Sequence, residues 1–455
     1  MVRLPLSGFA RRFRILIAPV AFGLLAACGG SKAPSDQPIV TSVTAGDGQV
    51  VAVFQQDPSL SYWLFGANSS SISIKDWFNL PHAVSVHPAY SPQILGGLLN
   101  TVGAYSFIMN STSNGSPAGP ASAVFTVTPR LAGGVWNDYS GQGGFSTADM
   151  KTLAFAPGTN WLPYQSGTYL AAGANGAIYT SNDLPYAAAL RQAPTWTAQA
   201  STLSSNLNAA AWVGTAFVVA GDNGAIAYSL DAINWIQPTG VVFNLAGGGT
   251  VAQTNVTFRK LGYGNSSYFA AVSVATGGTP SAMVFTSPDL VTWTQQGAGV
   301  IPTSGNLNWA GTLPGVYAIL GDNGALFTSP DLVNWSDYTV SGGANLRSGA
   351  GGVAANANGV TYSVVVGDGG AVYSTTDGTT WSRAASTPAG STTLRSIAFG
   401  SRFMAVGDAG TVIFSDDGLT WSSPGTAPSG TLQATLFALG AYVAVGDGGK
   451  LVASY

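Results

Sequence analysis

The sequence contains no glutamate, only two histidines, His82 and His87, and a single cysteine, Cys28. One cysteine excludes an intramolecular disulfide, so packing must hold the fold together. Acid–base, metal and thiol sites are built largely from Glu, His and Cys, and their scarcity removes most of that chemistry. His82 and His87 lie in one segment, which we predict to be a loop, and no third type of metal ligand lies nearby. We therefore expect neither a metal nor a cofactor.

Charged residues are also scarce, at 8% of the 455 residues, whereas 46% are hydrophobic and 60 are glycine. Long helices are disfavoured, because glycine destabilises helix interiors. Disorder is disfavoured too, since 12 Trp, 17 Tyr and 20 Phe supply ample apolar area for a core.

The N-terminus has the pattern of an export signal. Four arginines precede an uncharged, mostly apolar run over Ile15–Ala27. As a helix this run would rise about 20 Å, which is too short for a bilayer core of about 30 Å but typical of a signal peptide. Residues 1–27 are therefore predicted to be removed on export.

The apolar run ends in Leu25-Ala26-Ala27-Cys28-Gly29, which resembles the lipobox of bacterial lipoproteins. This resemblance implies that Cys28 carries the lipid and tethers the mature protein to a membrane. Gly29 stands where inner-membrane lipoproteins carry Asp, which implies the outer membrane. The alternative is an ordinary secretory signal cleaved nearby, which would leave Cys28 as a free thiol.

Removal of the signal changes the charge balance. The chain after Cys28 carries 12 basic and 19 acidic residues, a net charge of −7. Binding to nucleic acid normally needs a broad basic surface, so that class of partner is excluded.

A flexible tether over residues 28–37 leads to a small β-domain at 38–130. Its strand-like runs are Gln49–Phe54, Tyr62–Phe65, Ala104–Met109 and Ala123–Thr128. The segment resembles a fibronectin type III domain in its opening run Ile39-Val40-Thr41-Ser42-Val43, in Trp63, in Leu98 leading to Tyr105, and in Gly119-Pro120. Phe54 departs from the pattern, because Trp is commoner there. The resemblance implies a β-sandwich that spaces and presents the C-terminal part of the chain.

Residues 131–455 contain an internal repeat. Its first motif is a glycine turn between two apolar runs, and we call this motif the GDxG turn. Such a turn suits a β-hairpin, because Gly, Asn and Asp accept positive φ. Its seven copies are Gly173–Gly176, Gly221–Gly224, Ala275–Thr279 (degenerate), Gly321–Gly324, Gly367–Gly370, Gly407–Gly410 and Gly446–Gly449.

The second phrase, here the Asp–Trp turn, reads Ser/Thr-x-Asp-x-x-x-Trp and comes after the glycine turn. Five copies keep the spacing from Asp to Trp at four residues, and a sixth, at Asp183, reaches Trp196 after an insertion. This resembles the Asp-box, or bacterial neuraminidase repeat, which implies about one four-stranded β-propeller blade per copy. The aspartates are Asp183, Asp231, Asp289, Asp331, Asp377 and Asp417.

We thus predict an all-β chain: a fibronectin type III-like sandwich, then a seven-bladed β-propeller over 131–455. The last copy of the repeat stops at Tyr455, and Trp136 precedes the first full copy without a partner. The strand around Val135-Trp136 is therefore expected to complete the last blade and close the ring. Because they recur in every blade, the aspartates of the repeat are expected to form turns, with their Trp residues packed between blades.

Asp-box propellers include sialidases, whose chemistry uses an arginine cluster, a Tyr assisted by Glu, and an Asp acid. This chain has no Glu. The sialidase Phe-Arg-Ile-Pro motif is absent, and Phe258-Arg259-Lys260-Leu261 matches only its first two residues. The remaining route to glycoside hydrolysis is a pair of aspartates outside the repeated turns, such as Asp138 and Asp149. A Ser–His–Asp triad is excluded because the propeller has no histidine. We expect a protein without enzymatic activity.

The innermost strand of each blade opens with an apolar residue followed by a polar one. One per blade, these polar residues should lie at one level around a channel mouth, where they would attract an anionic group. The alternative is solvated strand ends without a ligand. The seven residues are Lys151, Asn208, Arg259, Asn308, Arg347, Arg395 and Gln433.

The inner strands that open with Leu and a polar residue, together with the GDxG and Asp-box turns, give the chain a pattern that also resembles the photosystem II stability and assembly factor propellers. That resemblance implies a non-enzymatic adaptor that holds a protein partner through a basic patch. The leading hypothesis is a lipid-anchored scaffold at the outer membrane whose partner is an envelope or extracellular protein. The alternatives are a glycan-binding module, which needs exposed aromatic residues such as Trp77, Trp161 or Trp309, and a divergent glycoside hydrolase.

Overall fold

The structure is a computed structural model that describes residues 33–46, 49–72, 84–96, 103–115, 117, 119–158, 167–184, 187, 192–275, 278–353, 359–424 and 428–454. The expected signal peptide 1–27, Cys28, Trp77, His82 and Trp161 lie outside these ranges. Within them, no helix has the length and apolar character needed to cross a membrane.

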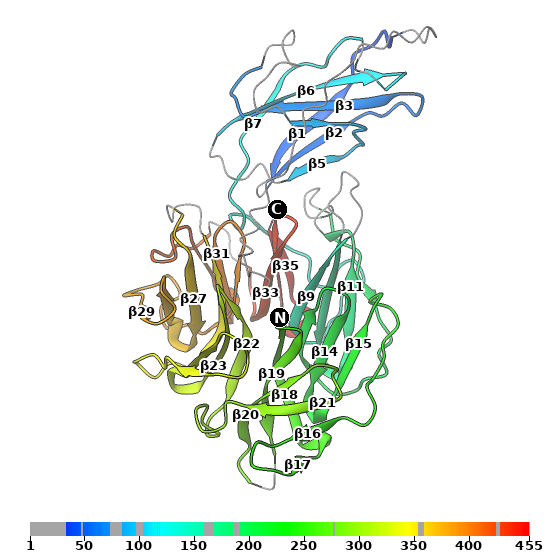
Figure 1. Ribbon diagram of the computed structural model, residues 1–455. Coiled ribbons are helices and arrows are strands. Elements are labelled where there is room, and N and C mark those ends of the chain that lie inside the picture. The colour runs from blue at the N-terminus through cyan, green and yellow to red at the C-terminus, as the bar shows by residue number, and fades with distance from the viewer. Residues whose placement is uncertain are drawn as a thin grey trace, which may run out of the picture.

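The N-terminal unit consists of two β-sheets (Figure 1). Apolar residues of β2 and β3, such as Val50, Phe54 and Leu64, are buried with Phe107 and Met109 in one core cluster. The run Gln49–Phe54 forms a strand as predicted, and the other three predicted runs form strands with slightly shifted ends. One sheet has the order β1 (Val40–Gly46), β2 (Gln49–Phe54), β5 (Gln93–Gly96), and the other β4 (Val84–Val86), β3 (Ser61–Ala67), β6 (Tyr105–Thr112), β7 (Phe125–Val127).

His87 comes directly after β4 and stacks on Trp63, with ring centroids 4.1 Å apart. Burial against this ring lowers the pKa of the His87 imidazole. In the described part of the chain, no three His, Cys, Asp or Glu side chains come close enough to hold a metal ion.

Seven further sheets succeed one another along the described residues from 136 to 454. Sheet 1 contains β9 (Met150–Pro157), β10 (Gly167–Gly173), β11 (Ile178–Ser181) and β12 (Thr197–Ala198). Sheet 2 contains β13 (Leu207–Trp212), β14 (Phe217–Gly221) and β15 (Ile226–Ser229). Sheet 3 contains β18 (Val256–Gly264), β19 (Ser267–Val274), β20 (Ser281–Ser287) and β21 (Thr292–Gln296).

Sheets 4 to 7 repeat the same antiparallel order. Sheet 4 contains β22 (Leu307–Leu313), β23 (Val316–Gly321), β24 (Leu326–Ser329) and β25 (Ser336–Asp337), and sheet 5 contains β26 (Leu346–Gly352), β27 (Tyr362–Gly367), β28 (Val372–Thr375) and β29 (Ser382–Arg383). Sheet 6 contains β30 (Leu394–Phe399), β31 (Phe403–Gly407) and β32 (Val412–Ser415). Sheet 7 contains β33 (Leu432–Ala438), β34 (Ala441–Gly446), β35 (Leu451–Ser454) and, at its edge, β8 (Trp136–Asp138).

Sheet 3 is wider than the others. The insertion between Trp235 and Trp293 adds β16 (Val242–Asn244), which pairs in parallel with β21, and β17 (Thr250–Val251) at the outer edge. Phe243 of β16 is fully buried beside Trp293, so the added strand enlarges the core of this sheet.

The seven sheets form a ring. The first strands β9, β13, β18, β22, β26, β30 and β33 each contact the next, and β33 contacts β9. β8 comes from the start of this region and pairs antiparallel with β35, which comes from its end. The edge of sheet 7 is thereby covered by the chain that enters the ring. Figure 1 shows the N-terminal unit outside the ring, on the side of the sheet that contains β35.

Candidate functional site

The seven polar residues expected at the channel mouth occupy one structural position. In each first strand the pairing with the second strand skips one residue, as a β-bulge. In sheet 2, for example, Leu207 pairs with Gly221 and Ala209 with Ala220, which leaves Asn208 between them. A bulge re-aims the side chain that it frees. The seven skipped residues are Lys151, Asn208, Arg259, Asn308, Arg347, Arg395 and Gln433, and we call them the ring residues.

The GDxG turn lies at the same end of each sheet as the ring residue. Close approach requires glycine at its first position, because a Cβ on Gly221 would lie 1.8 Å from the carbonyl oxygen of Asn206. The next turn residue, Asp222, donates its N–H to that same carbonyl. Its carboxylate is thereby held beside the ring residue Asn208.

In five sheets the Asp of the GDxG turn binds the ring residue of its own sheet. Asn208 and Asn308 each donate an amide hydrogen bond, at 2.8 and 2.9 Å, to Asp222 and Asp322. Arg347 is bidentate to Asp368, with Nε 2.7 Å from Oδ1 and Nη2 2.8 Å from Oδ2. The other two pairs are Arg395 with Asp408 and Gln433 with Asp447.

These pairs change the expected electrostatics of the mouth. The hydrogen bond from Arg347 lowers the pKa of the Asp368 carboxyl, so both groups are charged near neutral pH. The sequence alone predicted free positive charge at Arg347 and Arg395. The structure shows instead that both are paired with aspartates. The aspartates of the GDxG turns neutralise them, in addition to shaping the turns.

In three sheets the asparagine before the opening leucine is a partner that the sequence analysis missed. The side-chain amides of Asn206, Asn306 and Asn345 donate to the Asp of the GDxG turn, at 3.0, 2.7 and 2.9 Å. The sequence signal was present, since Asn-Leu-Asn occurs twice and Asn-Leu-Arg once at the start of these strands.

Sheets 1 and 3 lack the aspartate. The turn of sheet 1 has Ala174 in its place, and the turn of sheet 3 is the degenerate Ala275–Thr279, of which residues 276 and 277 lie outside the described ranges. Among the described residues, Lys151 has only a 3.5 Å contact from Nζ to Oδ1 of Asn208, and the exposed Arg259 has no hydrogen bond or ion pair. The two ring cations without a carboxylate thus flank sheet 2.

A third cation lies beside them. Nζ of the half-buried Lys260 donates to the backbone oxygen of Asn208 at 3.1 Å, and burial lowers the pKa of this lysine to about 8. The amide of Asn208 also donates to the backbone oxygen of Phe258, the residue before Arg259. Lys151, Arg259 and Lys260 therefore gather around Asn208, and we call these three residues the basic sector. Asp222 is the one carboxylate that Asn208 binds there.

The comparisons with known proteins agree with this ring. A family described as "DUF6242 beta propeller domain" matches residues 329–454. The chain contains a β-propeller. No curated protein matches the sequence of this chain.

Similar solved structures include one described as "YCF48 bound to D1 peptide", with 15% identity, a TM-score of 0.46, and coverage of 70% of this chain and 96% of that chain. The WD40 propeller domain of Doa1 has 8% identity and a TM-score of 0.49, over 69% of this chain and 94% of that chain. The extracellular domain of BT4673 from B. thetaiotaomicron has 8% identity and a TM-score of 0.47, over 70% of this chain and 39% of that chain.

The Asp–Trp turns lie at the opposite end of the propeller sheets, because they come after the third strand, which runs away from the GDxG turn. Oδ1 of Asp231 accepts hydrogen bonds from the N–H groups of Ile233 and Asn234, at 2.9 and 2.8 Å. Asp289, Asp331, Asp377 and Asp417 accept the equivalent pairs, and Asp183 accepts from the N–H of Thr195.

These bonds affect the ionisation of the turn carboxylates Asp231, Asp331 and Asp377. Backbone hydrogen bonds lower the pKa of Asp231, Asp331 and Asp377 most strongly. Six similar carboxylates, each bound within its own turn and spread around the far rim, do not form one reaction centre.

The aspartates outside the repeat are also engaged. Asp138 binds Nζ of Lys450 at 2.5 Å and the hydroxyl of Ser140, and Asp149 accepts the N–H of Gly448 at 2.7 Å. Trp309, the described candidate for a sugar platform, is half-buried and packs against the core of sheets 4 and 5. Neither alternative function gains an observation from these residues.

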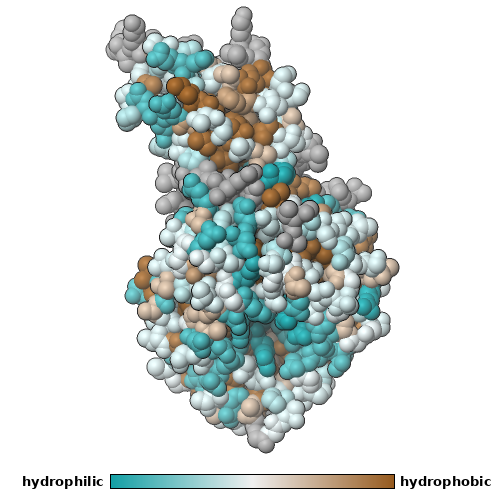
Figure 2. All heavy atoms as spheres, turned by 180° about the vertical axis from the view of Figure 1, so that it is seen from behind, coloured by the Kyte–Doolittle hydropathy of each residue, from teal (hydrophilic) through white to brown (hydrophobic). Residues whose placement is uncertain are grey.

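The surface view is consistent with a polar central region. Figure 2, seen from behind, shows hydrophilic residues in a band down the middle of the propeller and around a hollow near its centre.

Proposed function

We propose that this protein is a lipid-anchored, non-enzymatic scaffold of the cell envelope, and that its propeller binds a protein partner through the basic sector. In this account Cys28 carries the lipid at the outer membrane, and the fibronectin type III-like unit spaces the propeller from it. The propeller is seven-bladed, built from Asp-box repeats and closed by β8. Two sheets support the first unit's assignment, with the strand orders β1-β2-β5 and β4-β3-β6-β7.

The observation that carries the proposal is the uneven neutralisation of the mouth. At the mouth, ion pairs with turn aspartates neutralise Arg347 and Arg395. Away from the ring residues, Arg402 and Lys450 are also paired with carboxylates. Among the described residues, no ion pair joins a carboxylate to a cation of the basic sector, although the chain after Cys28 carries a net charge of −7. An isolated positive region on an acidic molecule steers and orients an anionic group while it disfavours nonspecific binding to other polyanions.

The chemistry of the sector selects the ligand class. Lys151 and Arg259 supply charged donors, and Asn208 already satisfies its amide hydrogens within the protein. The amide oxygen of Asn208 faces Nζ of Lys151 at 3.5 Å, so the groups that the sector offers to a ligand are its charged donors, which suit an acidic loop or a C-terminal carboxylate of a protein.

The test is a crosslinked pull-down of the affinity-tagged mature protein from native envelopes, analysed by mass spectrometry. We expect one envelope protein to be enriched with wild type and lost, by about tenfold or more, with the double variant Lys151→Gln/Arg259→Gln, because two charged donors disappear. Both side chains are solvent-accessible, so the variant should fold.

The matched control is Arg395→Gln/Asp408→Asn, which removes one ring cation together with its counter-charge. It should capture the same protein as wild type. Equal capture by wild type and the Lys151/Arg259 variant, or no specific capture at all, would contradict the proposal.

A further inference from the structure

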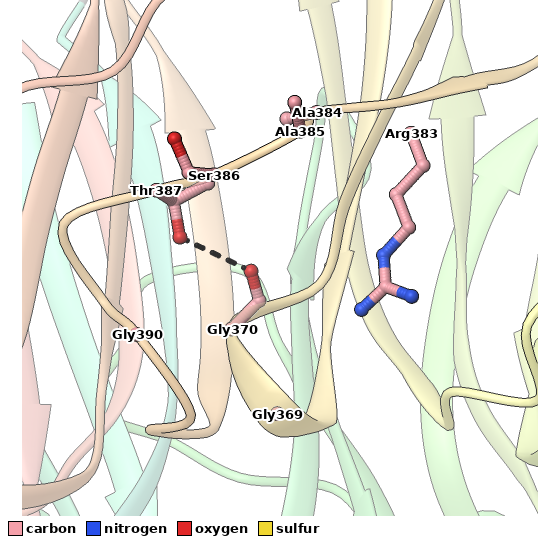
Figure 3. Close-up of a pocket in the computed structure, with 8 residues that line it drawn as sticks. All are labelled: Gly369, Gly370, Arg383, Ala384, Ala385, Ser386, Thr387 and Gly390. Carbon is pink, nitrogen blue, oxygen red and sulfur yellow. Dashed lines mark hydrogen bonds between the residues drawn. The ribbon is translucent and has the colours of Figure 1, made fainter.

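A second exposed cation without a carboxylate partner lies in sheet 5. Arg383, in β29, lines a cavity of about 390 Å³ between the GDxG turn of that sheet and the connection to sheet 6 (Figure 3). Among the described residues, the side chain of Arg383 has no ion pair or hydrogen bond, and its contact is with the ring of Tyr373. It is the only charged residue in the wall, whose other members are Gly369, Gly370, Ala384, Ala385, Ser386, Thr387 and Gly390.

The guanidinium is positioned by its surroundings. It lies over the ring of Tyr373, with Cζ 5.8 Å from the centroid. Tyr373 is buried and donates its hydroxyl hydrogen to the backbone oxygen of Ser341 at 2.8 Å, so this support is fixed. A Cβ on Gly342 would lie 3.4 Å from Nη1 of Arg383, so the guanidinium rests against backbone on that side.

The floor of the cavity is backbone. Gly369 and Gly370 both have positive φ, 64° and 66°. A Cβ on Gly370 would lie 2.2 Å from the carbonyl oxygen of Gly390, so only glycine permits this close approach. Thr387 closes the other side with a 3.2 Å hydrogen bond from its hydroxyl to the oxygen of Gly370, as Figure 3 shows.

Arg383 also departs from the repeat. The residue two places after the Trp of the Asp–Trp turn is Ala198, Gln237, Gln295, Asp337, Arg383 or Ser423. The positive charge is therefore particular to sheet 5, unlike the turn residues that recur for structural reasons. The carboxylate of the turn in this sheet, Asp368, is already occupied by Arg347 and Asn345.

We propose that this cavity is a carboxylate-binding site, distinct from the basic sector, which takes the terminal carboxylate of a short peptide or a small organic acid. Arg383 binds the two carboxylate oxygens side by side, since a guanidinium matches that planar group. The glycine turn and the small side chains of the wall leave room for the ligand backbone. One cation suits a singly charged carboxylate better than a dianionic phosphate.

The experiment is a ligand-observed NMR titration of the mature protein with N-acetyl-glycyl-alanine, and with the C-terminal amide of the same dipeptide as the matched probe. We expect the carboxylate to bind and the amide to bind about tenfold more weakly or worse, because a charge-assisted bidentate contact is lost. Arg383→Gln should weaken carboxylate binding by a similar factor, while Arg395→Gln/Asp408→Asn, which removes a cation together with its counter-charge, leaves it unchanged.

Two results would overturn the site: equal binding of the carboxylate and the amide, or full binding by Arg383→Gln. Loss of binding with Arg259→Gln alone would move the carboxylate to the basic sector. Circular dichroism of Arg383→Gln confirms folding, since this exposed side chain has no hydrogen bond to lose. The outcome is independent of the pull-down, which reads a protein partner through Lys151 and Arg259.

Discussion

Arg402→Ala is expected to destabilise the propeller by about 3 kcal/mol, because it removes a buried guanidinium and leaves Asp416, whose side chain is 23% exposed, without its partner. The Arg402 side chain is 6% exposed, and its Nε and Nη2 lie 2.6 and 2.5 Å from the two oxygens of Asp416. Its guanidinium also lies 3.9 Å from the ring centroid of Phe414 and reaches the backbone oxygen of Ala132.

The contact with Ala132 explains why the effect should be global. Ala132 precedes β8, the strand that covers the edge of sheet 7, so Arg402 fastens the chain that enters the ring to sheet 6. Urea unfolding followed by tryptophan fluorescence measures the change. Arg395→Ala is the matched control: its ion pair with Asp408 is about one-third exposed on both sides, and its loss should cost about 1 kcal/mol or less. Equal destabilisation by the two variants would contradict this account.

Trp293→Ala is expected to cost about 3–5 kcal/mol, as large-to-small changes of buried aromatic residues do. Trp293 is fully buried, stacks 5.9 Å from Phe243 and meets Phe258 edge-on at 5.3 Å. Its Nε1 donates to the backbone oxygen of Leu290 at 3.1 Å, and that oxygen would lose its partner.

The control is Trp235→Ala, the same position of the repeat in sheet 2. Trp235 is half-buried, so its removal transfers less apolar area to water and should cost about half as much. Calorimetric or urea unfolding compares the two variants. A loss at Trp235 as large as the loss at Trp293 would mean that the extra strands β16 and β17 do not strengthen the core of sheet 3.

Much of the fold could be predicted from periodicity. The apolar run Gln49–Phe54 predicted β2, and repeated glycine turns predicted the hairpins between second and third strands. The unpartnered Trp136 predicted a strand at the edge of the last sheet, and β8 pairs there with β35. These features are local, or recur often enough for a single sequence to display them.

The charge state of the mouth was not predictable in the same way. The Leu-polar pattern brought seven ring residues to one level, but it did not show that Asp368 reaches back 21 residues to Arg347. That pairing depends on the bulge, which frees the ring side chain, and on Asn345, which orients the carboxylate. Arg383 was not predicted as a site residue because nothing in the sequence places it against the Gly369-Gly370 turn.

The central claim is that the basic sector is open because sheet 1 lacks a turn aspartate. The most direct test restores it: Ala174→Asp converts Gly-Ala-Asn-Gly to Gly-Asp-Asn-Gly, the sequence that sheets 2 and 4 already use. This variant should fold like wild type, and its new carboxylate should pair with Lys151. Crosslinked capture of the proposed partner should fall about fivefold or more, as expected for about 1 kcal/mol of opposing charge. Unchanged capture by Ala174→Asp would contradict the claim.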